Sequence, residues 1–202
     1  KKDKTTVVTL KLDAFESAFI VFRKRGNSLS DRIEANFPEP RTLVNITTPW
    51  EVSFDKAMGG PEDRVTMPDL EDWTKNNDER IRYYSGTAIY KNTFVIDKIP
   101  REETLYLNLG NVNLMAEVKV NGQLAGGVWT PPWQVDITNL VKTGENSIEV
   151  DVVNNWINHL IGDSRLPEKD RYTWINVNQI KPDDPLQPSG LMGPVSVVSV
   201  RY

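Results

Sequence analysis

Apolar and polar side chains alternate along several short stretches of this chain. In residues 115–120, Val118 and Val120 point to one side and Glu117 and Lys119 to the other. A period of two is typical of a strand with one face in the core and the other in solvent. The stretches with strand character are 5–12, 18–25, 50–54, 86–96, 104–109, 115–120, 146–153 and 194–201.

Turn signals separate these stretches. Asn121-Gly122 predicts a β-hairpin of type I′, because both central positions of that turn need positive φ. Gly144-Glu145-Asn146 predicts another turn, and residues 136–141 predict one short helical turn capped by a side-chain oxygen of Asp136 or Thr138. No stretch keeps a 3.6-residue period over ten residues. The chain is therefore predicted to be all-β, a β-sandwich of the jelly-roll type.

Two long segments, 55–85 and 155–192, lack strand character. Loops of this length in a compact domain are usually functional or pack against a neighbour. We divide the chain into two parts. Residues 1–48 hold N-terminal strands and a linker, which could be the tail of a preceding domain. Residues 49–202 form the predicted sandwich.

Composition excludes several classes of function. The net charge of −4 argues against a nucleic-acid partner, because phosphate binding needs clustered Lys and Arg. The lack of cysteine excludes disulfides and thiolate sites, and a single histidine, His159, excludes a His-rich metal site. We expect His159 on the surface or in a loop. No apolar run approaches the roughly 20 residues of a membrane span. The chain starts at Lys1 without Met, which we interpret as a processed or excised piece of a longer protein.

Nine short motifs follow one another from about residue 49 onward. They are TPWEVSF, SGTAIYKNTF, LNLGNV, VNG, WTPPW, DIT, GEN, NNWINHLIGD and PSGLMGPV. This series resembles the C-terminal region of the large α-L-rhamnosidases of glycoside hydrolase family 106. It is also similar to the sugar-binding domain of glycoside hydrolase family 2. One position departs from the pattern: His159 stands where the family usually has Arg, and a histidine would carry its full charge there only at acid pH.

The resemblance implies a galactose-binding-like β-sandwich that belongs to a larger glycoside hydrolase. In those enzymes a separate (β/α)₈ barrel carries the catalytic carboxylates, and this chain lacks the length and the βα alternation of such a barrel. The implied partners are carbohydrate and the barrel of the same polypeptide. The implied location is the periplasm or the exterior of a bacterium. We assign no catalytic residue, and we expect Glu149 and Asp151 on the outward face of a strand.

The tryptophans indicate where a sugar would bind. Four of the six fall between residues 129 and 174, in segments that also carry Asn154, Asn155 and Arg165. An indole face suits the C–H face of a sugar, and amide or carboxylate side chains suit its hydroxyl groups. The candidate ligand-binding residues are Trp129, Trp133, Asn121, Trp156, Asn158 and Asp163.

Each of these residues also has a structural interpretation. We expect Trp50 and Trp73 in the core, Trp129 outward, and Trp133 against the core or its rim. For Asp163 we favour a hydrogen bond to backbone over a ligand contact. The sequence leaves open whether Trp129 meets a sugar or a neighbouring domain.

No cofactor is predicted, although a structural calcium ion could use oxygen ligands from residues 76–79 or 183–184. The spacing of these residues is not diagnostic. Three functions remain. The first is an accessory sandwich that completes or supports the substrate site of a catalytic barrel. The second is a self-standing, lectin-like carbohydrate-binding module. The third is a purely structural or adhesion sandwich, which predicts that all four clustered tryptophans are buried.

Overall fold

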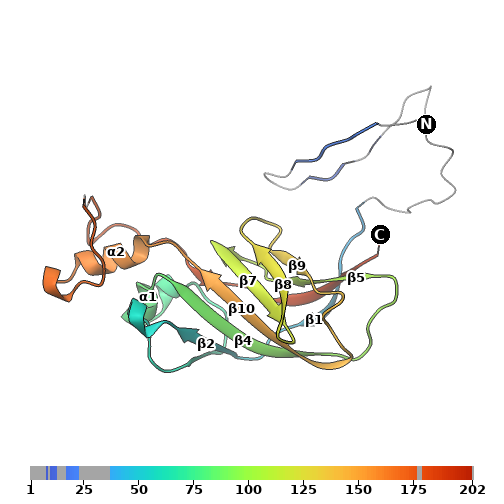
Figure 1. The fold of residues 1–202 in the computed structure, drawn as a ribbon, viewed down its shortest axis with the longest axis horizontal. Helices are drawn as coiled ribbons and strands as arrows, with labels where there is room; N and C mark the ends of the chain where they lie inside the picture. The colour runs from blue at the N-terminus through green and yellow to red at the C-terminus, as the bar shows by residue number, and fades with distance from the viewer. Residues whose placement is uncertain (1–7, 9, 13–16, 23–36, 177–178, 202) are drawn as a thin grey trace.

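The computed structural model describes residues 8, 10–12, 17–22, 37–176 and 179–201 and shows an antiparallel β-sandwich (Figure 1). One sheet has the order β1-β12-β5-β9. Its strands are β1 (Arg41–Asn45), β12 (Ser196–Val200), β5 (Thr104–Asn108) and β9 (Gln134–Asp136). The other sheet has the order β3-β2-β4-β10-β7-β8. Its strands are β3 (Val65–Met67), β2 (Trp50–Phe54), β4 (Thr87–Ile96), β10 (Gly144–Val153), β7 (Met115–Val120) and β8 (Gln123–Val128). A short pair joins β6 (Val112–Asn113) to β11 (Gly190–Leu191).

The core lies between the two sheets and takes the inward side chain of every second residue. Tyr90 and Val150 come from the larger sheet, and Leu107 and Val197 come from the smaller one. All four are fully buried, and burial of such a side chain contributes about 1.5–3 kcal/mol. The predicted all-β sandwich is confirmed.

Aromatic side chains fill the part of the core next to β2, and they confirm the predicted burial of Trp50 and Trp73. Phe54, Trp73 and Tyr84 pack edge to face, with ring centroids 4.9–5.6 Å apart. The indole nitrogen of Trp73 donates a hydrogen bond to the hydroxyl of Tyr90 at 2.5 Å. This bond gives the polar tip of a buried Trp the partner that it needs.

The outward face of the larger sheet carries charges, as the alternation predicts. Lys119 forms ion pairs with Glu149 at 2.8 Å and with Asp151 at 3.2 Å, and Lys91 pairs with Glu149 at 2.9 Å. Such exposed pairs add little to stability, about 0–1 kcal/mol each. The broad face of this sheet is therefore a mixed-charge surface.

Most predicted strands match observed ones, with differences of one or two residues at their ends. The predicted turn at 144–146 is wrong. These residues begin β10, because β4 is long enough to pair with them, and Gly144 lies opposite Ile96. The strands predicted at 5–12 and 18–25 are not found at residues 8, 10–12 and 18–22, whose backbone is not in a sheet. The rest of both segments lies outside the described residues.

β1 lies before the expected boundary at residue 49 and forms part of the smaller sheet. It pairs with β12, with Arg41 opposite Ser199 and Asn45 opposite Ser196. The sequence did not reveal this strand, because its residues do not alternate clearly in polarity.

The predicted turns that follow β7 and β9 are both confirmed. Asn121 and Gly122 have φ values of 51° and 77°, as a type I′ hairpin between β7 and β8 requires. After β9, the Asp136 side chain accepts a hydrogen bond from Thr138 N at 2.9 Å and caps one turn. The Thr138 hydroxyl instead accepts a hydrogen bond from Leu105 N.

The two long segments contain short elements that the pattern did not predict. Segment 55–85 holds β3 and three short helices, and segment 155–192 holds a longer helix, a further short one and β11. The helices are η1 (Lys56–Met58), η2 (Trp73–Lys75), α1 (Glu79–Arg82), α2 (Ile157–Ser164) and η3 (Glu168–Asp170). Each is shorter than the ten residues over which a helical period becomes visible. Within the described residues, no helix is long and apolar enough to cross a membrane.

The expected surface position of His159 is wrong. His159 lies on α2 with only 6% of its surface exposed, between the rings of Trp156 and Tyr172 at centroid distances of 6.1 and 5.5 Å. Its Nε2 atom is 3.8 Å from a carboxylate oxygen of Asp163. Burial lowers the pKa of His159 below its usual range, and the nearby Asp163 carboxylate opposes this effect only in part.

A glycine substitution tests the packing of β11 against the aromatic core. A Cβ atom on Gly190, where φ is +103°, would meet the Trp73 indole at 2.5–2.8 Å. We expect Gly190→Ala to lower the free energy of unfolding by about 3 kcal/mol in urea denaturation. Gly144→Ala is the matched control, since φ is +92° there with open space around it, and we expect a loss of about 1 kcal/mol. Equal losses would contradict this packing.

The buried histidine predicts a pH dependence of stability. Because the pKa of His159 is lower in the folded state, this side chain is protonated at a higher pH in the unfolded chain than in the folded chain. The contribution of neutral His159 to the free energy of unfolding is therefore complete above about pH 6.5, and it declines as the pH falls toward the lowered pKa. We expect the stability of the chain to fall more steeply between about pH 6.5 and 5 than that of His159→Gln, measured by urea denaturation at each pH. Parallel curves would show that His159 titrates normally.

Candidate functional site

Most of the functional candidates lie at one end of the larger sheet. The strand register places the ends of β2, β8 and β10 next to the starts of β4 and β7: Phe54 is opposite Ala88, Val153 is opposite Thr87 and Met115, and Ala116 is opposite Val128. We call this edge the loop end. Figure 1 shows α1 and α2 just beyond it.

Buried hydrogen bonds around Ser189 hold the loop end together. Ser189 N donates to the Asp72 carboxylate at 3.0 Å, and its Oγ atom accepts from Asn154 and Asn158, both at 3.1 Å. Asn154 also donates to Tyr84 O at 2.9 Å. These four polar side chains are nearly inaccessible to water. We call this set of hydrogen bonds the hub. It joins η2, the start of β4, the start of α2 and the residues just before β11.

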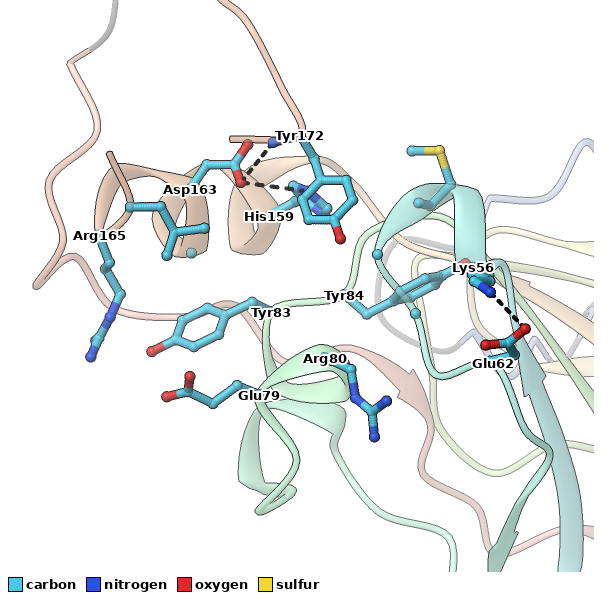
Figure 2. Close-up of a pocket in the computed structure, with 15 residues that line it drawn as sticks. Lys56, Glu62, Glu79, Arg80, Tyr83, Tyr84, His159, Asp163, Arg165 and Tyr172 are labelled. Carbon is cyan, nitrogen blue, oxygen red and sulfur yellow. Dashed lines mark hydrogen bonds and ion pairs between the residues drawn. The ribbon is translucent and has the colours of Figure 1, made fainter. Parts of the chain in front are cut away.

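A pocket of about 400 Å³ opens between η1, α1 and α2 (Figure 2). The η1 side begins at Asp55, whose side chain caps η1 through Ala57 N at 2.8 Å. Gly59 follows with φ +79° and lies against the rings of His159 and Tyr172. Asp55 N is tied to the Tyr84 hydroxyl at 3.0 Å, which fixes this wall to the core.

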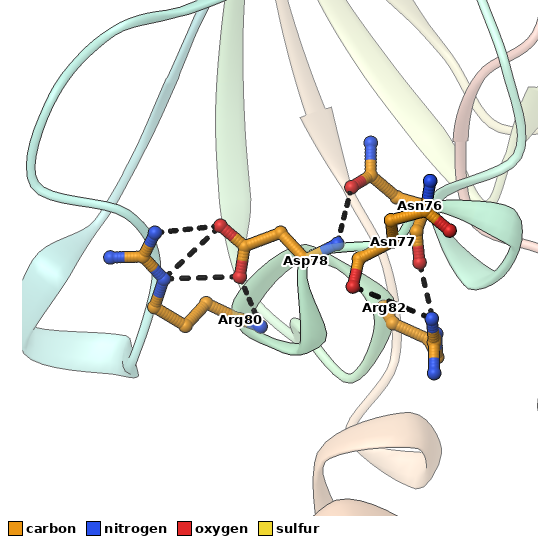
Figure 3. A network of polar contacts seen from close by, with 5 residues as sticks. All are labelled: Asn76, Asn77, Asp78, Arg80 and Arg82. Atoms are coloured by element: carbon orange, nitrogen blue, oxygen red, sulfur yellow. Dashed lines mark hydrogen bonds and ion pairs between the residues drawn. The ribbon is translucent and has the colours of Figure 1, made fainter.

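The α1 side of the pocket is held by a polar network at its N-terminus (Figure 3). The Asp78 carboxylate accepts from Arg80 N at 2.9 Å and from the Arg80 guanidinium at 2.7–3.2 Å. The bonds from Arg80 hold the pKa of Asp78 below its usual value. Arg82 donates to Asn76 O at 2.9 Å, and Asp78 N donates to the Asn76 side chain at 2.8 Å. The network orients α1, and Tyr83 and Tyr84 directly follow it.

The α2 side packs onto Tyr83 without a gap. A Cβ atom on Gly162 would lie 2.8 Å from the Tyr83 side chain, so only glycine lets the helix approach this closely. The guanidinium of Arg165 lies over the Tyr83 ring, 5.5 Å from its centroid. Asp163 then ties the following loop back to α2, because its carboxylate accepts from Tyr172 N at 3.2 Å and Thr173 N at 2.7 Å.

A second feature of the loop end is a row of exposed apolar side chains along three neighbouring strands. Trp156 lies three residues after β10, Leu114 directly precedes β7, Met115 begins β7, and Trp129 directly follows β8. All four are large apolar residues with high exposure. We call this set the apolar row. Gathered apolar exposure of this kind is typical of a contact surface.

The predicted tryptophans divide between the surface and the core. Trp129 is 73% exposed, as predicted, and Trp156 and Trp174 are 50% and 79% exposed. Trp133 is half-buried against the core, and its backbone oxygen accepts from Leu109 N at 2.8 Å. Trp129 and Trp156 thus share the loop end, while Trp133 serves the sandwich.

The other three predicted ligand residues have internal partners. Asn121 donates to Leu140 O and Asn146 Oδ1, both at 2.9 Å, and accepts from Ser147 N at 3.1 Å. Asn158 is bound on both of its polar atoms to residues 187–189. Asp163 accepts from backbone, which confirms the structural interpretation that the sequence favoured. Sugar binding by Asn121 or Asn158 would require these bonds to break.

Three of the side chains considered for calcium accept local hydrogen bonds. The Asp78 and Asn76 side chains bond within the α1 network, and Asp184 accepts from Lys181 N at 2.8 Å. Among the residues that the structure describes, no cluster of three acidic or histidine side chains could hold a metal ion.

Sequence reasoning missed most of the pocket. Its wall residues Tyr83 and Tyr172 and its rim residues Lys56 and Arg80 come from the two segments without periodicity. Their length had marked both segments as functional candidates, but it did not reveal which of their residues would form a pocket.

Comparison with known proteins places this fold within larger enzymes. A putative beta-glucuronidase from Formosa agariphila is 36% identical in an alignment of 190 residues that covers 79% of this chain and 16% of that protein. The structure of a rhamnosidase from Novosphingobium sp. PP1Y superposes with a TM-score of 0.77 at 33% identity, over 85% of this chain and 16% of that one. This chain therefore spans less than a fifth of the length of either relative.

More distant structures share the fold alone. The beta-D-glucuronidase of Dictyoglomus thermophilum superposes with a TM-score of 0.55 at 22% identity, over 83% of this chain and 29% of that one. A family model described as glycosyl hydrolase 2 galactose-binding domain-like matches residues 66–183, more than half of the chain. The β-sandwich with its loop end thus has a known family: the chain belongs to the glycosyl hydrolase 2 galactose-binding domain-like proteins.

Proposed function

We propose that this chain is the non-catalytic accessory sandwich of a larger glycoside hydrolase, and that its loop end docks beside the catalytic domain of the same polypeptide. The observation that carries the proposal is the apolar row, exposed on a chain that matches only 16% of each of two larger relatives. The remaining length of such a protein supplies a partner for this surface. Docked in this way, the sandwich would support or complete the substrate site of the catalytic domain.

The apolar row is suited to a protein partner. Its residues lie at or just beyond the ends of adjacent strands of one sheet, which limits the ordering needed on contact. Trp and Met are enriched at protein interfaces, and a buried Trp often dominates the binding energy. By contrast, the broad outer face of the larger sheet carries paired charges, which disfavour a dry interface. The loop end is therefore the side that would face the enzyme.

We further propose that the parent enzyme is similar to the α-L-rhamnosidases of glycoside hydrolase family 106. Support comes from the ordered motifs and from the Novosphingobium rhamnosidase, which is similar over 85% of this chain. The Formosa relative, a putative beta-glucuronidase, is similar at a comparable identity of 36%. The substrate of the parent is thus a separate question from the role of this domain.

The two other functions predict different behaviour. A purely structural sandwich would bury all four clustered tryptophans, and the exposure of Trp129, Trp156 and Trp174 speaks against it. A self-standing lectin-like module would bind glycans through these side chains without any partner. The affinity of such a module for glycans would be the same inside and outside the parent protein.

A pair of substitutions in the parent protein tests the docking role. Trp129→Ser removes a side chain that is 73% exposed in this chain, so we expect the isolated chain to change in stability by no more than about 0.5 kcal/mol. In the parent protein we expect the same change to weaken docking by about 2 kcal/mol or more, seen as an earlier unfolding transition of this domain in calorimetry.

Leu124→Ser is the matched control, because Leu124 is 60% exposed at the opposite end of β8. We expect it to leave the unfolding of the parent protein unchanged. If Trp129→Ser and Leu124→Ser behave alike in the parent protein, the loop end does not dock. Glycan binding that is lost in Trp129→Ser, without any effect on unfolding, would instead favour the lectin-like module.

A further inference from the structure

Residues 17–22 form an apolar segment that the sandwich does not use. The sequence predicts a strand over 18–25, but the backbone of residues 18–22 is not in a sheet. Figure 1 shows this segment apart from both sheets of the sandwich. The core of the sandwich takes its side chains from residues 43–197, whereas Phe19 and Phe22 are 94% and 74% exposed. The chain thus leaves two phenylalanine side chains in solvent.

The apolar side chains of this segment would occupy both faces of a strand. Successive side chains of a strand point to opposite sides, so Phe19 and Val21 would share one face, and Ile20 and Phe22 the other. All four are exposed in this chain. A strand that is apolar on both faces is typical of a sheet with a packed layer on each side. A membrane span needs about 20 apolar residues, and the run at 18–22 is far shorter.

Residues 8–12 show a different pattern, that of a strand with one face in solvent. Val8, Leu10 and Leu12 are exposed apolar residues at every second position, and Thr9 and Lys11 stand between them in the sequence. Such alternation predicts a strand with one buried face. The two segments together have the composition of two strands of one sheet, in which the strand at 17–22 is the more deeply buried.

The rest of the same polypeptide supplies a sheet for these strands to join. This chain matches only 16% of each of two larger relatives, and a protein of that length folds as several domains. Residues 23–40 connect the segment to β1, and an extended connection of that length reaches about 60 Å. The segment can therefore pair within a neighbouring domain while β1 stays paired with β12.

From these features we propose that residues 17–22 are a strand of a β-sheet in a neighbouring domain of the parent polypeptide, where both faces of the strand are buried. The strand is absent from this chain because its backbone hydrogen bonds need a paired neighbour, which lies in that other domain. Backbone pairing would give the affinity, and pockets for the alternate side chains would fix the register. This inference shares with the proposed function only the premise of a longer polypeptide, and it uses no residue of the apolar row.

Hydrogen exchange of the backbone amides of residues 17–22 tests the proposal. Amides that are paired in a sheet exchange slowly, and unpaired amides exchange fast. The measurement compares the 202-residue chain with the parent protein, by mass spectrometry of the peptide that contains this segment. We expect exchange close to the unstructured rate in the chain, and exchange at least about 100-fold slower in the parent protein.

Substitutions on the two faces test whether both are buried. In the parent protein, Phe19→Ser and Phe22→Ser should each speed the exchange of this segment by about tenfold or more, because each would leave a cavity in the core that the strand joins. In the 202-residue chain neither should change the urea midpoint, because both side chains are exposed there. Val95→Ser is the matched control, since Val95 is an exposed apolar residue of β4, and it should leave the exchange of the segment unchanged.

Several results would overturn the proposal. Fast exchange of the segment in both proteins would show that it has no partner strand in the parent protein. Slow exchange in the 202-residue chain would make the sandwich itself the partner, or a second copy of the chain if the protection rises with concentration. An effect of Phe19→Ser without an effect of Phe22→Ser, or the reverse, would show that only one face is covered.

The docking role is tested separately. It is read from the unfolding transition that Trp129→Ser should shift, and Trp129→Ser should leave the exchange of residues 17–22 unchanged. Failure of either proposal is therefore distinguishable from failure of the other.

Discussion

The buried hydrogen bonds around Ser189 are the constraint on which the loop end depends. They join four segments that lie up to 117 positions apart in the chain, through Asp72, Asn154 and Asn158. Each of these polar groups is buried, so each bond that is lost would leave an unpaired group in a dry environment. The positions of Tyr84 and the start of α2 follow from this hub. The walls of the pocket at Tyr84 and α2 are therefore tied to one buried hydrogen-bond cluster and not carried by independent loops.

The regular part of the fold could be predicted from local patterns. The alternation in β7 and β10 and the Asn121-Gly122 hairpin depend on residues close together in the chain, and a period of two reveals them. β1 and β3 are short and have no clear alternation, so they were missed. Segment 144–146 has turn residues, but the length of the neighbouring β4 decides its structure. Pairing with a distant strand overrides local preference here.

The functional end was harder to predict, because polar residues gain their roles from distant partners. Trp129 was placed correctly from its position between Gly and Pro residues. Asn121 resembled a sugar contact, yet its side chain binds Asn146 and Leu140. His159 was expected at the surface because a lone polar residue usually lies there, and α2 buries it against Tyr172. No local pattern in the sequence carries this information.

The pairing of β1 with β12 has a consequence for how such a domain is carried. Arg41 lies opposite Ser199, so the first and the last strand that the structure describes are neighbours in one sheet. A host polypeptide can accommodate a unit of this kind at a single position on its surface, because the two connections need not span the domain. Side-by-side first and last strands are thus a geometry that suits insertion of a sandwich at one point of a larger protein.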